Sequence, residues 1–118
     1  MTSLIACLST GKGSWIEVKK LISSGMFEKT FLVTNDFGRE KFQTDDKTEL
    51  IVIDNQADTQ EIIKGIVAGL GSKLSGEVAL NMTSGSGKEH MALLSAIMKL
   101  GLGFRLVEPG EQGGVKEI

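Results

Sequence analysis

Residues 76–101, GEVALNMTSGSGKEHMALLSAIMKLG, place a strand, a loop and a helix in succession. The first six residues read as a short buried strand, and the run from Ser86 to Gly101 predicts an apolar helix that ends at glycine. Between them lies a loop of small hydroxyl and glycine residues. Loops in this position, between a strand and a following helix, bind ligands in open α/β sheets.

The same alternation of strands and helices extends along the chain. The predicted strands cover 3–9, 30–35, 49–54, 76–81, 104–108 and a short edge at 113–118; helices cover 11–25, 59–74 and 86–101, and 36–47 is a polar loop or short helix. Strands that are apolar on both faces and separated by helices indicate a mainly parallel sheet that is covered on both sides. We therefore predict one α/β domain over residues 1–118: a three-layer, doubly wound, Rossmann-like fold with about five to six strands.

Charge and cysteine content limit the classes of function. The 118 residues carry a net charge of −2 and a pI of about 5.4, which argues against binding long DNA or RNA through a basic face. The apolar runs fall short of the roughly 20 residues that span a membrane, and we expect no signal peptide. The single Cys7 cannot form an intramolecular disulfide, and its apolar neighbours predict a buried structural thiol in a cytoplasmic protein.

Two loops are candidate ligand sites, STGKGS at 9–14 and TSGSGK at 83–88. Glycines let backbone amides approach a ligand, and the helix N-terminus that follows each loop adds donors and partial positive charge. Lys88 and His90 lie in the first turn of a helix, a position that favours acidic residues unless an anion is nearby. A purely structural role stays open, since Gly/Ser turns commonly lead strands into helices.

Known nucleotide-binding motifs do not fit these loops. The Walker motif GxxxxGK[ST], aligned on Gly87 and Lys88, requires glycine at 82 and Ser or Thr at 89, whereas this chain has Met82 and Glu89. The first loop lacks the third glycine of GxGxxG. Asp54 matches the strand-end aspartate of response regulators, but the acidic pair that would follow the first strand is missing. ATP hydrolysis and dinucleotide chemistry are therefore disfavoured.

The run Asn81-Met82-Thr83-Ser84-Gly85-Ser86-Gly87-Lys88-Glu89-His90-Met91 resembles the signature of the CRISPR-associated Rossmann-fold (CARF) domains. That signature typically reads N-x-T-G-G-T-K-x-M; here Ser84 replaces the first glycine and two extra positions lie around the lysine. The family's other ligand loop follows the first strand and carries a hydroxyl residue, which Leu8-Ser9-Thr10-Gly11 matches. The resemblance implies a sensor of cyclic oligoadenylates, the second messengers of type III CRISPR defence.

The resemblance also implies roles for individual residues. Amides and hydroxyls for phosphate and ribose would come from the second loop: Thr83, Ser84, Gly85, Ser86 and Gly87. Lys88 would pair with a phosphate, and the other side of the ligand would be closed by Ser9, Thr10 and Gly11. Asn35 and Asp36, after the second strand, would contact an adenine edge. We expect no metal ion and no cofactor.

Two alternatives to a sensor stay open. Some relatives in this family cleave the cyclic messenger without metal, and here Lys88 would stabilise the charge on phosphorus while Ser9 orients the ribose whose 2′-hydroxyl attacks its own phosphodiester. A Rossmann-like domain that binds a mononucleotide is the other alternative.

The helix that follows the second loop predicts a partner. Between Met91 and Leu100 its only charged residue is Lys99, whereas a surface helix is normally polar on one face. A two-fold homodimer would cover the second apolar face. The resemblance also implies paired protomers, with the ligand across their axis. Because we expect no second domain in this chain, a separate effector protein would receive the signal.

Overall fold

Strands and helices alternate along the described residues, as the sequence predicts. The structure, a computed structural model, describes residues 2–9 and 14–118. Its strands are β1 (Thr2–Leu8), β2 (Phe27–Thr34), β3 (Thr48–Val52), β4 (Glu77–Asn81), β5 (Gly103–Pro109) and β6 (Val115–Glu117). Its helices are α1 (Trp15–Ser23), α2 (Asp36–Lys41), α3 (Thr59–Leu70) and α4 (Gly87–Lys99). No helix within the described ranges is long and apolar enough to cross a membrane.

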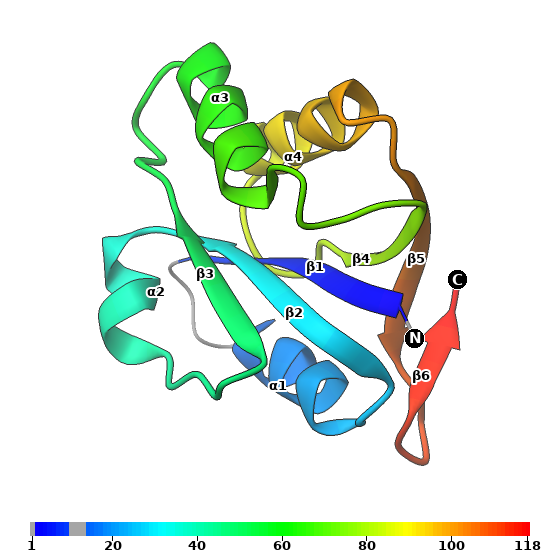
Figure 1. Ribbon diagram of the computed structural model, residues 1–118. Coiled ribbons are helices and arrows are strands. Elements are labelled where there is room, and N and C mark those ends of the chain that lie inside the picture. Colours follow the sequence, from blue (N-terminus) through cyan, green and yellow to red (C-terminus); the bar gives the residue numbers. More distant parts are fainter. Residues whose placement is uncertain (1, 10–13) are drawn as a thin grey trace.

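The six strands of the described chain form one sheet in the order β3-β2-β1-β4-β5-β6 (Figure 1). Strands β1 to β5 are parallel, and β6 runs antiparallel to β5. The predicted mainly parallel sheet and its short edge strand are therefore confirmed. From β1 the chain adds β2 and then β3 toward one edge of the sheet. It then returns to the other side of β1 with β4 and adds β5 toward the opposite edge, so the strand order reverses between β1 and β4. A ligand crevice at the carboxyl ends of the strands forms at such a reversal.

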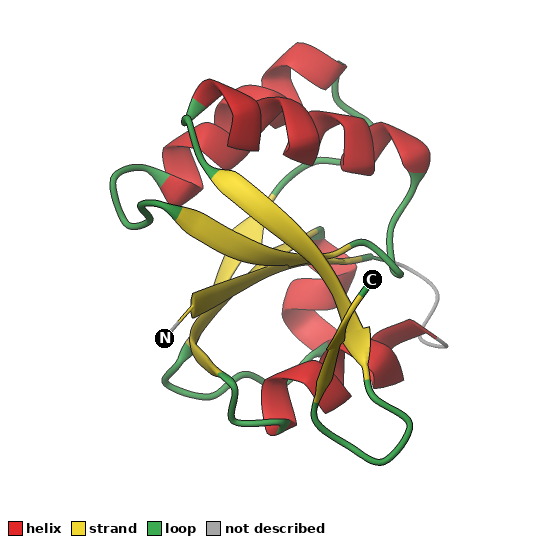
Figure 2. Cartoon of the chain, turned by 90° about the vertical axis from the view of Figure 1, so that its right-hand side faces the viewer, coloured by secondary structure: helices red, strands yellow, loops and turns green. Residues whose placement is uncertain are grey.

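Alternate residues of the central strands face opposite sides of the sheet. Ile5 and Cys7 of β1 belong to a core that includes Leu93 of α4 and residues of α3. Leu8, on the other face of β1, packs with Trp15 of α1. Helices α3 and α4 accordingly lie together on one side of the sheet, and α1 lies on the opposite side (Figures 1 and 2). Both faces of β1 are covered, which is why that strand is apolar throughout.

Helix α4 is held mainly by the face that it turns to the sheet. Ala92, Leu93, Ala96 and Ile97 have no exposed surface. Burying a leucine or isoleucine side chain contributes about 1.5–3 kcal/mol each. This exceeds the roughly 1 kcal/mol that an N-cap contributes. Packing of this face therefore fixes where the N-terminus of α4 lies.

Helix α2 occupies the polar segment after β2, where the sequence predicts a loop or short helix. Gly38 lets it approach the strand, because a β-carbon there would lie 1.8 Å from Oγ1 of Thr34. Asn35 caps the helix: its Oδ1 accepts a hydrogen bond from the amide of Gly38 at 3.0 Å. Asn35 and Asp36 are thereby held at the carboxyl end of β2.

Candidate functional site

The two predicted ligand loops meet at the point where the strand order reverses. The backbone amide of Ser9, directly after β1, donates to Oγ of Ser84 in the loop after β4 at 3.4 Å, and both residues are buried. The indole Nε1 of Trp15 donates to the carbonyl of Ser9 at 2.7 Å and so holds its other side. Thr10 and Gly11, which were also predicted to line the site, lie outside the described residues. The structure brings Ser9 together with the loop at 83–88.

Asn81 anchors the loop that follows β4. Its side chain is buried, and its Nδ2 donates to the carbonyl of Val107 in β5 at 2.9 Å. Its Oδ1 accepts from the amide of Thr83 at 3.2 Å. Each end of the amide thus has a backbone partner, and the loop leaves the strand in a defined direction toward β1.

Gly85 makes a close approach to β1 that a larger residue would prevent. Its φ of +102° lies in a region that L-residues with a side chain rarely adopt. A β-carbon at this position would also lie 3.1 Å from Cβ of Cys7 and 3.1 Å from Nε2 of His90. The glycine of the predicted loop therefore permits the contact between the two halves of the sheet.

A capping box orders the start of α4. Oγ of Ser86 accepts from the amide of Glu89 at 3.3 Å, and Oε1 of Glu89 accepts from the amide of Ser86 at 2.7 Å. These bonds leave the amides of Gly87 and Lys88 with no hydrogen-bond partner in the described chain. Two backbone donors at the N-terminus of α4 are thus open to a ligand.

The loop is closed from the helix side by His90. Its Nε2 lies 2.8 Å from the carbonyl oxygen of Ser84. Because a carbonyl only accepts, this nitrogen carries the proton and donates to Ser84. His90 therefore ties the first turn of α4 to the preceding loop.

Cys7 and Glu89 lie buried beneath the loop. Burial, and secondarily the negative charge of Glu89, raise the pKa of the Cys7 thiol to about 12. Cys7 is therefore a neutral thiol at physiological pH, as the prediction of a structural cysteine requires. Oε2 of Glu89 is buried and has no hydrogen-bond partner among the described residues.

Lys88 supplies the positive charge of the site. Its side chain is half-buried, and it forms no ion pair within residues 2–9 and 14–118. Arg39, on α2, is by contrast paired with Asp36 at 2.9 Å. An unpaired ammonium next to two open amides is an arrangement that favours a bound anion.

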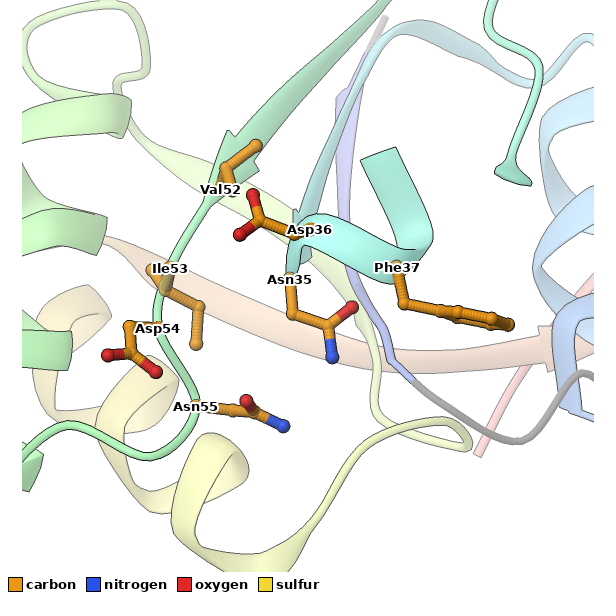
Figure 3. A pocket seen from close by; sticks show the side chains of 7 residues that line it. All are labelled: Asn35, Asp36, Phe37, Val52, Ile53, Asp54 and Asn55. Atoms are coloured by element: carbon orange, nitrogen blue, oxygen red, sulfur yellow. The ribbon is translucent and has the colours of Figure 1, made fainter. Parts of the chain in front are cut away.

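Asn35 and Asp36 do not lie in this crevice but line a pocket of about 520 Å³ beside it (Figure 3). The pocket lies at the carboxyl ends of β2 and β3 and is lined by Asn35, Asp36, Phe37, Val52, Ile53, Asp54 and Asn55. Leu8 of β1 is paired with Thr34 of β2, which in turn is paired with Val52 of β3. Since neighbouring strands are about 4.8 Å apart, the pocket is roughly 10 Å from the end of β1, a distance that one nucleotide can bridge.

The crevice beside Lys88 and the pocket lined by Asn35 and Asp36 differ in electrostatic character. The crevice offers Lys88 and open amides, whereas Asp36 and Asp54 make the pocket acidic. No three His, Cys, Asp or Glu side chains within residues 2–9 and 14–118 are grouped so that they could hold a metal ion. Among the described residues, the crevice therefore offers hydrogen-bonding groups and the Lys88 ammonium.

The outer face of α4 is apolar, as the sequence predicts. Met91 is 68% exposed and Met98 is 72% exposed. Together with Leu94, Ser95 and Lys99 they line a shallow hollow of about 420 Å³. The spacing of Met91, Leu94 and Met98 places these side chains along one stripe of the helix.

No protein-family model matches this chain, and no curated protein matches it. The site is therefore interpreted from its own residues.

Three residues of the two sites were missed by reasoning from the sequence. The capping role of Glu89 was readable in the spacing of Ser86 and Glu89, which is the S-x-x-E signature. Asn81 entered the sequence analysis as the strand-end residue that opens the signature-like run, and its side-chain bond from β4 to β5 was not predicted. Asn55 had no local signal, because its place beside Asn35 depends on the pairing of β2 with β3.

Proposed function

We propose that this protein is a sensor that binds a cyclic oligoadenylate second messenger of type III CRISPR defence as a homodimer. In this proposal the sheet and its helices form the three-layer, doubly wound, Rossmann-like arrangement of CARF domains. The observation that carries it is the bond between Ser9 and Ser84, which joins the two ligand loops at the reversal of the strand order.

The phosphates of the ring would lie at the N-terminus of α4. The open amides of Gly87 and Lys88 would donate to phosphate oxygens, and the Lys88 ammonium would neutralise one charge. The hydroxyls of Thr83 and Ser86 lie in the same loop and would add polar contacts. The loop departs from the Walker pattern because it would hold internal phosphodiesters and not the terminal phosphates of ATP with their magnesium ion.

The adenine part of the ligand would extend toward β2. Asn35 and Asp36 line the adjoining pocket, where an amide and a carboxylate are available to a base edge. The acidic character of this pocket complements the positive character of the crevice. A nucleotide that spans both would place its anionic phosphate beside the Lys88 cation and its uncharged base beside the carboxylates.

The dimer would form through the apolar face of α4. Met91 and Met98 are the most exposed large apolar side chains of this helix, and covering them removes apolar surface from water. A two-fold axis beside α4 would bring a loop and a helix N-terminus from each protomer to one ring of phosphates. A separate effector protein would then recognise the dimer with the ring bound.

A metal-independent ring nuclease is the alternative that one observation favours. Ser9 is held on two sides, because its amide donates to Ser84 and its carbonyl accepts from Trp15, so its backbone is fixed beside the loop. In the reaction, the ribose 2′-oxygen gives its proton to solvent and bonds to its own 3′-phosphorus, while the bond to the 5′-oxygen breaks. That oxygen takes a proton from solvent, so a 2′,3′-cyclic phosphate and a 5′-hydroxyl are formed. Lys88 would stabilise the charge that develops on the phosphoryl oxygens.

A thermal-shift titration tests the proposal. Cyclic tri-, tetra- and hexa-adenylate are compared with linear oligoadenylate, ATP and AMP. A ligand that binds only the folded state raises the melting temperature as its concentration passes the Kd. A shift confined to one ring supports the sensor, whereas equal shifts with AMP and ATP support a mononucleotide site. The absence of a shift with every ring refutes the proposal. Incubation of that ring with stoichiometric protein and EDTA then separates sensor from nuclease.

A further inference from the structure

Glu89 is a buried carboxylate in the first turn of α4. Only 2% of its surface is exposed, and it forms no ion pair within the described ranges. Its Oε1 accepts from the amide of Ser86 at 2.7 Å, so the carboxylate group is directed back to the N-terminus of its own helix. A phosphate on the open amides of Gly87 and Lys88, which lie between these two residues, would therefore bind close to a fixed negative charge.

Hydrogen bonds satisfy only one of the two oxygens of this carboxylate. Oε2 of Glu89 is the one buried side-chain nitrogen or oxygen of the described chain that has no hydrogen-bond partner. Water screens a buried charge weakly, so the field of Glu89 extends to neighbouring groups. The thiol of Cys7 shows this effect, because burial is the main cause of its raised pKa and the charge of Glu89 adds to it. An anion at the start of α4 would be subject to the same field.

The positive and negative charges at this helix start nearly balance. The unpaired amides carry the partial charge of the helix N-terminus, the Lys88 ammonium adds one positive charge, and Glu89 cancels it, which leaves a net charge of roughly +0.5. The attraction of a ligand to the site increases in proportion to the ligand's charge, whereas the cost of removing the ligand from water increases with the square of that charge. A site with a small net charge therefore favours a singly charged group.

We propose that Glu89 limits the negative charge that the N-terminus of α4 accepts, so that this site binds singly charged phosphate diesters and disfavours doubly charged terminal phosphates. Glu89 would act through its charge and without touching the ligand. The proposal rests on the proposed function in one respect, which is the placement of a phosphate at this helix start. The terminal phosphate of a mononucleotide would accordingly bind less well here than an internal phosphodiester.

The test uses two small phosphate esters that differ in charge. At about pH 8, dimethyl phosphate carries one negative charge and monomethyl phosphate carries two, because the second pKa of a phosphate monoester is about 6. Backbone Cα signals of Gly87 and Lys88 are assigned by NMR and followed in both titrations. The ionic strength is held constant, because added salt screens charges, and the single pH keeps the charge state of His90 the same throughout.

The original chain gives the first result. We expect monomethyl phosphate to bind no more tightly than dimethyl phosphate, although a site with an uncompensated cation would prefer the ester with two charges. If monomethyl phosphate binds roughly tenfold more tightly than dimethyl phosphate, the proposal is overturned. This comparison needs no substitution, so it decides the question even if a variant of Glu89 fails to fold.

Glu89→Gln removes the charge and keeps the capping box. Glutamine retains a side-chain oxygen for the amide of Ser86, and it serves in capping boxes as glutamate does. Coulomb energy is proportional to the product of the charges, so the Kd of dimethyl phosphate should fall by roughly threefold and that of monomethyl phosphate by the square of this factor, roughly tenfold. A change of shape alone would alter both Kd values by the same factor. Glu28→Gln, at an exposed position at the amino end of β2, should change neither.

The outcomes separate this inference from the sensor function. If both esters bind and Glu89→Gln changes their Kd values equally, Glu89 does not select charge, and the phosphate site stands. If the two factors differ as expected and no cyclic oligoadenylate binds, the charge selection stands and the sensor is wrong. If neither ester moves the Gly87 and Lys88 signals in either chain, the N-terminus of α4 binds no phosphate, and both proposals are wrong.

Discussion

The amide of Ser9 lies 3.4 Å from Oγ of Ser84, although 75 positions separate the two residues in the sequence. This contact joins the carboxyl ends of β1 and β4 and holds the two loops of the candidate site together. Ser84→Ala should lower the free energy of unfolding by about 1 kcal/mol, because the buried amide of Ser9 loses its acceptor. Urea denaturation measures the change, and Ser72→Ala, at an exposed turn, should be neutral. Equal stability of the two variants would show that the contact contributes nothing.

Gly85 tests whether the close approach to Cys7 is required. Gly85→Ala places a β-carbon 3.1 Å from Cβ of Cys7 at a φ of +102°, and we expect the protein to lose about 1–3 kcal/mol of stability. Gly87→Ala is the matched control two positions along, where a β-carbon meets no atom within 4 Å. Because alanine is the better helix former, this control should be neutral or slightly stabilising. A tolerated Gly85→Ala would mean that the loop is free to move away from β1.

The thiol of Cys7 predicts a loss of stability in alkaline solution. Burial and the charge of Glu89 raise its pKa from 9.0 to about 12 in the folded protein. The folded state therefore holds this proton more tightly than the unfolded chain, so the stabilisation is complete below pH 9 and is lost as the pH rises toward 12. In this window the free energy of unfolding should fall by up to roughly 1.4 kcal/mol per pH unit.

Cys7→Ala isolates that contribution. Urea denaturation from about pH 8.5 to 10.5 should give a steeper decline for the original chain than for the variant, since only the former has the thiol to ionise. Alanine also removes buried volume, which lowers stability by the same amount at every pH. Parallel declines would show that other groups cause the alkaline loss.

Lys88 should contribute the main charge to ligand binding. If a cyclic oligoadenylate binds, Lys88→Ala should raise its Kd by roughly tenfold or more, since a hydrogen bond to a charged group contributes about 1.5–3 kcal/mol. Lys20→Ala, on α1, removes the same charge elsewhere and should leave the Kd unchanged. Isothermal titration calorimetry measures both variants. An unchanged Kd in Lys88→Ala would place the phosphates outside the N-terminus of α4.

The apolar face of α4 predicts how the protein associates. Met98→Glu should shift a dimer toward monomer, because it puts a charge in the centre of a surface that must lose its water. Ile16→Glu, at a 58% exposed position on α1, adds the same charge to an apolar site away from this face and should have no effect. Sedimentation velocity distinguishes the two outcomes. A monomeric original chain, or a dimer that tolerates Met98→Glu, would contradict an interface on α4.

The local pattern of the chain was sufficient to predict the elements and the two loops. Apolar runs such as 3–9 and 76–81 can be buried only in a covered sheet, and glycines with hydroxyl residues before a helix allow a tight turn with exposed amides. The capping box of Ser86 and Glu89 was equally local, because its two residues lie three positions apart. These features depend on backbone geometry within one or two turns, which nearby residues determine.

Only the tertiary structure decided which segments meet. The strand order places Ser9 beside Ser84 and Asn35 near Asn55, with the crevice at the ends of β1 and β4 and the acidic pocket at the ends of β2 and β3. Such contacts follow from the pairing of strands whose apolar faces look alike, so no short stretch of residues specifies them. The sequence alone therefore determined the strands, helices and loop chemistry of this protein, while the packing of the sheet determined the shape of its sites, because that packing optimises burial over the whole chain.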